Sequence, residues 1–155
     1  PEKQELLNLE KTGKFVFHGT GRDVALLTPH QAVDIKSGPD RKPAIFASPA
    51  ADFAIFLAIF CKRNFPDSNF VFQSGAFTHE DGSFKLEFVV PQAALEQLPD
   101  SACGWVYIFN KKDFSPIKGR AAECESRTVV KPVKRIKVFK RDLPKNIKLG
   151  IEDTL

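Results

Sequence analysis

The chain has 155 residues, of which 43% are hydrophobic and 27% charged, and a formal net charge of +4. These values are those of an ordinary globular protein and predict one domain, long enough to bury a core without disulfides. They argue against a membrane protein, because the longest apolar run, 44–61, is interrupted by Asp52. No signal peptide is expected either.

The cysteine pattern predicts a reducing compartment. Cys61, Cys103 and Cys124 are odd in number and widely spaced, which does not fit a disulfide framework and favours free thiols in the cytoplasm. No CxxC or Cys/His pair is present, so no metal site is expected. The chain starts at Pro1 and has no Met, which indicates a processed chain or a fragment.

Charge is divided unevenly along the chain. Positions 111–148 contain 13 Lys or Arg and four Asp or Glu, a local balance of +9, which leaves −5 for the remainder. A basic half is typical of proteins with a phosphate-rich partner, such as nucleic acid or a dinucleotide. The alternative is a solvated strand face.

The first half of the chain predicts a helix, a strand, a second strand and a second helix. The first helix spans 2–11 and ends at Gly13, and a strand at 15–17 follows. After a surface loop at 37–43, a buried strand at 44–47 leads into a helix that runs to about Lys62. Ser48 at the N-cap and Pro49 at N1 are expected to start it, with an apolar stripe along one side.

The second half predicts mainly strands. These elements are strands at 70–72 and 84–90 around a hairpin loop, a short helix at 91–98, and strands at 104–109, 123–130 and 133–139. Residues 1–143 are expected to form a single domain and 144–155 a C-terminal tail. The order of elements favours an α+β fold with a mixed or antiparallel split sheet over a doubly wound parallel sheet.

Three short segments could carry chemistry. His18-Gly19-Thr20 follows the first strand, so it presents an imidazole beside bare backbone groups, an arrangement suited to a ribose hydroxyl and a carboxamide. The alternative is a histidine satisfied by a loop carbonyl. In the second segment, 45–49, the periodicity predicts a core strand followed by the start of a helix. In the third segment, Glu123 and Glu125 lie two residues apart and therefore on the same face of a strand. Their carboxylates are either solvated or catalytic.

In this order the three segments resemble the ADP-ribosyltransferase superfamily of diphtheria-type toxins and poly(ADP-ribose) polymerases. They are also similar to small uncharacterised bacterial proteins with a His-Gly-Ser/Thr strand end and a late Tyr-Xaa-Tyr plus Glu-Ser segment. The resemblance covers roughly 14–138, and its specific part is about a dozen residues. It implies that NAD is the substrate, bound by His18, Gly19, Thr20, Phe46, Ser48, Phe53, Phe56 and Tyr107, with Glu123 or Glu125 as the catalytic carboxylate.

The resemblance also implies a role for each group. The imidazole of His18 would bond the ribose, the Gly19 backbone would hold the carboxamide, and an aromatic ring would stack on the nicotinamide. The glutamate would stabilise an oxocarbenium-like transition state. ADP-ribose would pass to an unknown nucleic-acid or protein acceptor, or NAD would be hydrolysed.

Two other functions remain open. Ile45 or Phe46 stands where the family has a second-strand Tyr, which favours a catalytically inactive member that serves in protein interaction. The other function is nucleic-acid binding by the basic half, with Trp105 and Tyr107 on one strand face as a platform for bases. The alternative is that this strand face packs under a helix.

Overall fold

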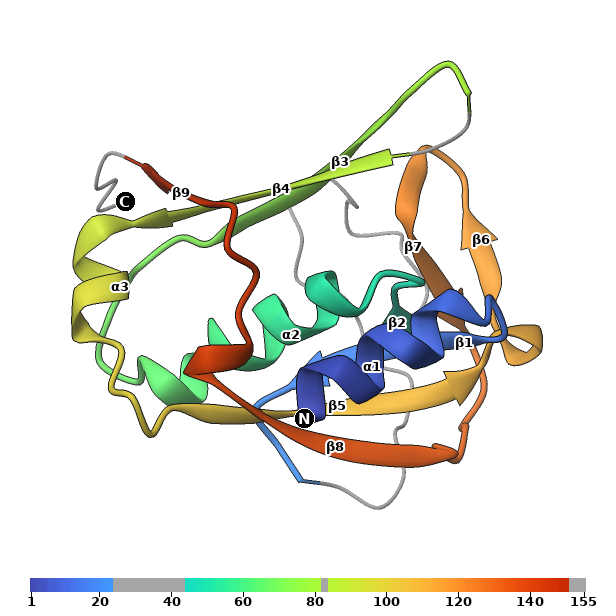
Figure 1. Ribbon diagram of the computed structural model, residues 1–155, viewed down its shortest axis with the longest axis horizontal. Helices are drawn as coiled ribbons and strands as arrows, with labels where there is room; N and C mark the ends of the chain where they lie inside the picture. The colour runs from blue at the N-terminus through green and yellow to red at the C-terminus, as the bar shows by residue number, and fades with distance from the viewer. Residues whose placement is uncertain (24–43, 82–83, 151–155) are drawn as a thin grey trace.

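The computed structural model describes residues 1–23, 44–81 and 84–150, and it shows the expected α+β class of fold (Figure 1). The helices in these residues are α1 (Glu2–Lys11), α2 (Ala51–Ile59) and α3 (Gln92–Gln97), with 3-10 helices η1 (Lys62–Asn64), η2 (Lys111–Asp113) and η3 (Lys140–Asp142). The strands are β1 (Phe15–Thr20), β2 (Ile45–Ala47), β3 (Gln73–Thr78), β4 (Phe84–Pro91), β5 (Cys103–Asn110), β6 (Ser115–Ile117), β7 (Arg120–Ser126), β8 (Lys134–Phe139) and β9 (Ile147–Gly150). None of the described helices is long and apolar enough to cross a membrane.

The strands form three small sheets in the orders β1-β5-β8, β2-β7-β6 and β3-β4-β9. All neighbours are antiparallel except β4 and β9, which run parallel. A single bridge joins the first two sheets: the backbones of Phe17 and Ser48 exchange two hydrogen bonds of 2.8 Å. It makes β2 the neighbour of β1, so the three strands that carry the segments of interest lie in the order β1, β2, β7.

Helix α2 forms the centre of the core. In Figure 1 it lies between the β3-β4-β9 sheet at the top and the β1-β5-β8 sheet at the bottom. Phe56 is fully buried, and its ring stacks on Phe88 of β4 with 4.6 Å between centroids. Leu57, which is 38% exposed, is the one exposed residue of α2. The helix is therefore apolar on nearly all sides, as a buried helix is, and not striped along one face as predicted.

Two glycines let α2 lie directly on the strands beneath it. A Cβ on Gly19 of β1 would overlap the carbonyl oxygen of Ala54, and a Cβ on Gly104 of β5 would overlap that of Ala58. Since only glycine permits so close an approach of backbones, the glycine after His18 has a packing role whatever else it does.

The start of α2 differs from the prediction. The helix begins at Ala51 with Ala50 at the N-cap, and Ser48 is the bridge residue, whose Oγ accepts the Ala50 N–H at 3.0 Å. The ring of Pro49 therefore precedes the helix. The helix also ends at Ile59, earlier than the expected Lys62, which instead opens η1.

Other elements also differ from the sequence-based prediction. The predicted strand at 70–72 is wrong: these residues precede β3, and Phe70 and Phe72 pack their rings against Phe65 at 5.8 and 5.2 Å. The short strand β6 was not predicted, and the strand expected at 123–130 spans Arg120–Ser126. The expected tail from 144 contains β9, which extends the β3-β4 sheet. The predicted loop at 37–43 lies outside the described residues.

The basic half of the chain is partly neutralised by the acidic half. Arg141 pairs with Glu2 of α1 at 3.5 Å, and Lys148 pairs with Glu87 of β4 at 3.3 Å. Lys134 on β8 pairs with Glu5 in the same way. The local excess of positive charge is therefore smaller on the folded surface than along the sequence.

Candidate functional site

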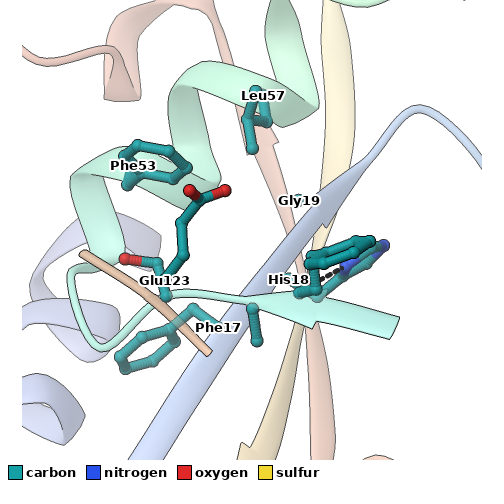
Figure 2. Close-up of a pocket in the computed structure, with 9 residues that line it drawn as sticks. Phe17, His18, Gly19, Phe53, Leu57 and Glu123 are labelled. Atoms are coloured by element: carbon teal, nitrogen blue, oxygen red, sulfur yellow. Dashed lines mark hydrogen bonds between the residues drawn. The ribbon is translucent and has the colours of Figure 1, made fainter. Parts of the chain in front are cut away.

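A pocket opens beside the bridge that joins β1 and β2, because beyond that bridge the two strands no longer pair. It is small, with a cavity volume of about 20 Å³ that holds roughly one water molecule, and it is partly open to solvent. Its lining comes from β1, β2, α2 and β7 and comprises Phe17, His18, Gly19, Phe46, Ala47, Ser48, Phe53, Leu57 and Glu123 (Figure 2).

The imidazole of His18 spans the gap between β1 and β2. Its Nδ1 donates a hydrogen bond to the backbone carbonyl of Phe46 (Figure 2). A carbonyl only accepts, so Nδ1 carries a proton in this contact. The ring is thus held by a carbonyl of strand β2, where the alternative expected a loop carbonyl, and it also lines the pocket.

Glu123 brings a carboxylate to the same pocket from β7. Figure 2 shows its side chain directed toward α2, beside Phe53. Its Oε2 accepts a hydrogen bond from Nη1 of Arg120 at 3.3 Å, and both side chains are about one-quarter exposed, at 26% and 23%. The arginine is therefore placed to orient the carboxylate.

The second carboxylate of the pair is arranged differently. Glu125 lies opposite Phe46 in the β2–β7 register and forms an ion pair with Arg127 at 3.0 Å. It does not contribute to the lining of the pocket. The structure therefore distinguishes two residues that the sequence left equivalent, since Glu123 lines the pocket and Glu125 does not.

One wall of the pocket is apolar. Phe53 and Leu57 lie one turn apart on α2, the spacing that places side chains on the same helix face. Phe53 is 6% exposed, whereas Leu57 is 38% exposed at the rim. Phe56, also predicted to bind NAD, points into the core against Phe88 and is fully buried.

Tyr107 and Thr20 are not among the residues that line the pocket. Tyr107 is 0% exposed and donates its hydroxyl hydrogen to the carbonyl of Arg22 at 3.1 Å. The Oγ1 of Thr20 accepts the backbone N–H of the same Arg22 at 3.2 Å. Both side chains therefore fix the chain where it leaves β1, and Tyr107 offers no exposed face to a base.

Two residues of the site were missed by the sequence analysis. Arg120 was overlooked because the strand was expected to begin at Glu123, after the arginine. Leu57 was treated as one of several core residues in an apolar stripe. A leucine that stays partly exposed inside a buried helix can only be recognised once the neighbouring strands are placed.

Chemically, the pocket combines a carboxylate, an imidazole held at Nδ1, backbone groups at a glycine, and an apolar wall. Such a combination of apolar lining with a few convergent polar groups is typical of small-molecule sites. Comparison of the chain with family models, curated proteins and solved structures found no match.

Proposed function

We propose that this pocket binds the nicotinamide and adjoining ribose of NAD, and that the chain transfers ADP-ribose to an acceptor or hydrolyses NAD. The observation that carries the proposal is that His18 and Glu123, from strands far apart in the sequence, line one pocket together with Gly19. These are the residues to which the sequence resemblance assigns the ribose, the carboxylate chemistry and the carboxamide.

The size of the pocket limits what it can hold. Pockets that bury a drug-sized ligand commonly enclose about 300–1,000 Å³, whereas this one encloses about 20 Å³, roughly the room for one water molecule. The nicotinamide and its ribose would therefore enter only after side chains of the rim, such as the 38% exposed Leu57, move aside, and the adenosine end of NAD would lie outside. The apolar wall of Phe53 and Leu57 suits the face of the nicotinamide ring. The imidazole of His18 would contact the ribose, the role that the sequence resemblance gives it.

The chemical step follows from the carboxylate. When the bond between the ribose C1′ and the nicotinamide nitrogen breaks, the bonding electrons leave with neutral nicotinamide and positive charge develops on the ribose. The ionised carboxylate of Glu123 would stabilise that charge, as carboxylates do in glycoside cleavage. Water or an acceptor nucleophile then bonds to C1′ and loses its proton.

A binding-only member of the same fold is the second candidate. Two observations favour it: Phe46 or Ile45 replaces the expected Tyr on β2, and the Arg120–Glu123 ion pair competes with a ligand for the carboxylate. Incubation with NAD, followed by chromatographic measurement of free nicotinamide, separates the candidates. Release that is lost in Glu123→Gln supports the enzyme, and binding of NAD without release supports the binder.

Binding itself is tested with a histidine variant and its matched control. His18→Ala should weaken NAD binding at least tenfold in calorimetry, whereas His79→Ala, which removes an exposed histidine outside the pocket, should leave it unchanged. NAD at a hundred times its dissociation constant should stabilise the wild-type fold by about 2.7 kcal/mol. Equal binding by both variants would refute the proposal.

A further inference from the structure

A row of alternating cations and aromatic rings lies on the sheet formed by β5 and β8. It consists of Trp105, Arg135, Lys137, Phe139 and Arg141, here called the cation–aromatic ladder. The Arg135 guanidinium lies 4.9 Å and the Lys137 ammonium 5.8 Å from the Trp105 ring centroid. Lys137 and Arg141 lie 5.6 and 4.5 Å from the centroid of Phe139. Each ring is therefore contacted by two cations.

Strand register explains why these side chains meet. Trp105 pairs with Lys137 in the antiparallel β5–β8 ladder, and Phe139 lies two residues further along β8 on the same face. The intervening Ile136 and Val138 are buried on the opposite face. Diagonal neighbours of this kind are roughly 7–8 Å apart, so the two rings lie on one surface with Lys137 between them.

The charges of the ladder are only weakly engaged. Arg135 pairs with Asp23, and these side chains are 46% and 42% exposed. Arg141 pairs with Glu2 at 3.5 Å, where the arginine is 62% exposed and the glutamate 33%. Exposed ion pairs of this kind contribute little and exchange readily. Among the residues that the structure describes, Lys137 forms no ion pair. Lys137 can therefore contact an anionic partner directly, whereas Arg135 and Arg141 would exchange their carboxylate partners for phosphates.

We propose that the cation–aromatic ladder binds single-stranded nucleic acid, with bases on the rings of Trp105 and Phe139 and phosphates on the three cations. Both rings are partly exposed, and aromatic rings interleaved with cations on a sheet are the chemistry that takes unpaired bases. A stretch of Asp and Glu residues would use the cations but has no aromatic face to stack on the rings. A duplex would hide the faces of its bases. The ladder shares no residue with the pocket lining, so this proposal is independent of NAD.

The chain carries a built-in reporter, since Trp105 is its one tryptophan. Titration with an oligothymidylate should quench Trp105 fluorescence, because stacking brings a base onto the indole. With three phosphate contacts, the log–log slope of affinity against salt should be about −2, from about −0.7 per contact on single strands. Inorganic polyphosphate should compete with the oligonucleotide without quenching the tryptophan.

Substitutions locate the site. Lys137→Ala should reduce the slope by about 0.7 and weaken binding, whereas Lys112→Ala, an equally exposed lysine on η2, should change neither. With a labelled oligonucleotide followed by anisotropy, Trp105→Leu should lose about fivefold or more in affinity and Trp105→Phe should retain most of it. Thermal unfolding checks that each variant folds.

Four results would overturn the proposal: no quenching by the oligonucleotide, quenching by polyphosphate alone, equal effects of Lys137→Ala and Lys112→Ala, or preference for a duplex of the same length. Binding to phosphatidylserine vesicles without binding to the oligonucleotide would assign the ladder to a membrane surface and would overturn it as well.

Discussion

Glu10, in the last turn of α1, accepts a hydrogen bond from the backbone N–H of Ala51, the first residue of α2, at 2.6 Å. A carboxylate at a helix N-terminus satisfies an N–H that has no partner within the helix and interacts favourably with the helix dipole. Because α2 carries Phe53 and Leu57, this contact links the N-terminal helix to the wall of the pocket.

Burial of Glu10 raises the pKa of its carboxyl group above the usual value for glutamate; the hydrogen bond from Ala51 opposes the rise, and the nearby charge of Asp52 adds to it. The folded protein therefore holds a proton on Glu10 more tightly than the unfolded chain does. The contribution of this group to stability is present below the ordinary glutamate pKa, about 4.3, and is lost as pH rises through the higher folded value.

Two substitutions at Glu10 separate the effect of the hydrogen bond to Ala51 from the effect of the carboxylate charge. Glu10→Ala should destabilise the fold by about 1–2 kcal/mol at any pH, because the Ala51 N–H loses its acceptor. Glu10→Gln keeps an acceptor oxygen for the Ala51 N–H, so its stability should be close to that of the wild type near pH 7. Because glutamine does not titrate, this variant should not become less stable as the pH rises above ~4.3, as the wild type should. Urea unfolding between pH 4 and 7 measures both effects. Equal stability of the two variants at pH 7 would contradict the capping role.

Gly19 is expected to tolerate no side chain. In Gly19→Ala the new methyl group would overlap the Ala54 carbonyl and force β1 away from α2, at a cost of about 1–3 kcal/mol or a failure to fold. Gly75→Ala on β3 is the matched control, since a Cβ there meets nothing within 4 Å. Denaturation midpoints of the two variants decide the point, and similar midpoints would refute the close approach of strand and helix.

The three cysteines should differ in reactivity. Burial raises the pKa of the Cys124 thiol to about 12, a rise that the nearby positive charge of Lys111 opposes and the negative charge of Glu123 increases. Thiolate is the reactive form, so Cys124 should resist a disulfide reagent at pH 8 while the partly exposed Cys61 and Cys103 react. Counting thiols before and after unfolding should give two and then three. Rapid reaction of all three in the folded protein would contradict the packing around β7.

Substitution of Tyr107 is expected to change the stability of the fold and to leave NAD binding unchanged. Tyr107→Phe removes the hydroxyl hydrogen bond to the Arg22 carbonyl at 3.1 Å, which should cost about 0.5–1.5 kcal/mol. NAD affinity should stay at the wild-type value, since the ring is fully buried outside the pocket. Calorimetry and thermal unfolding of this one variant test both statements. A large loss of NAD affinity with unchanged stability would return Tyr107 to the binding residues.

Sequence patterns correctly predicted the elements that depend on residues close together in the chain. The helix before Gly13, the first strand and the strand around Trp105 were identified from periodicity and glycine placement, although the first strand continues beyond residue 17 through His18 to Thr20. The paired carboxylates, Glu123 and Glu125, were placed on the right strand. Their different roles could not be predicted, because they depend on which residue lies beside the Phe17–Ser48 bridge.

Features that depend on distant contacts were missed. Ser48 has the chemistry of an N-cap, but its backbone is used by the bridge to β1, and the acceptor for α2 comes from Glu10 in another helix. The residues around Ile147 read as a tail because their short strand is stabilised by pairing with β4 and not by any pattern of their own. Tertiary pairing outweighed local propensity in both cases.

The central claim is most directly tested by calorimetric titration of NAD into wild type, Glu123→Gln and Glu125→Gln. The two variants remove the same charge from the same strand face, and only Glu123 lines the pocket. We expect Glu123→Gln to weaken NAD binding at least tenfold and Glu125→Gln to bind like wild type. No binding of NAD by the wild-type chain, or an equal loss in both variants, would contradict the assignment of this pocket to NAD.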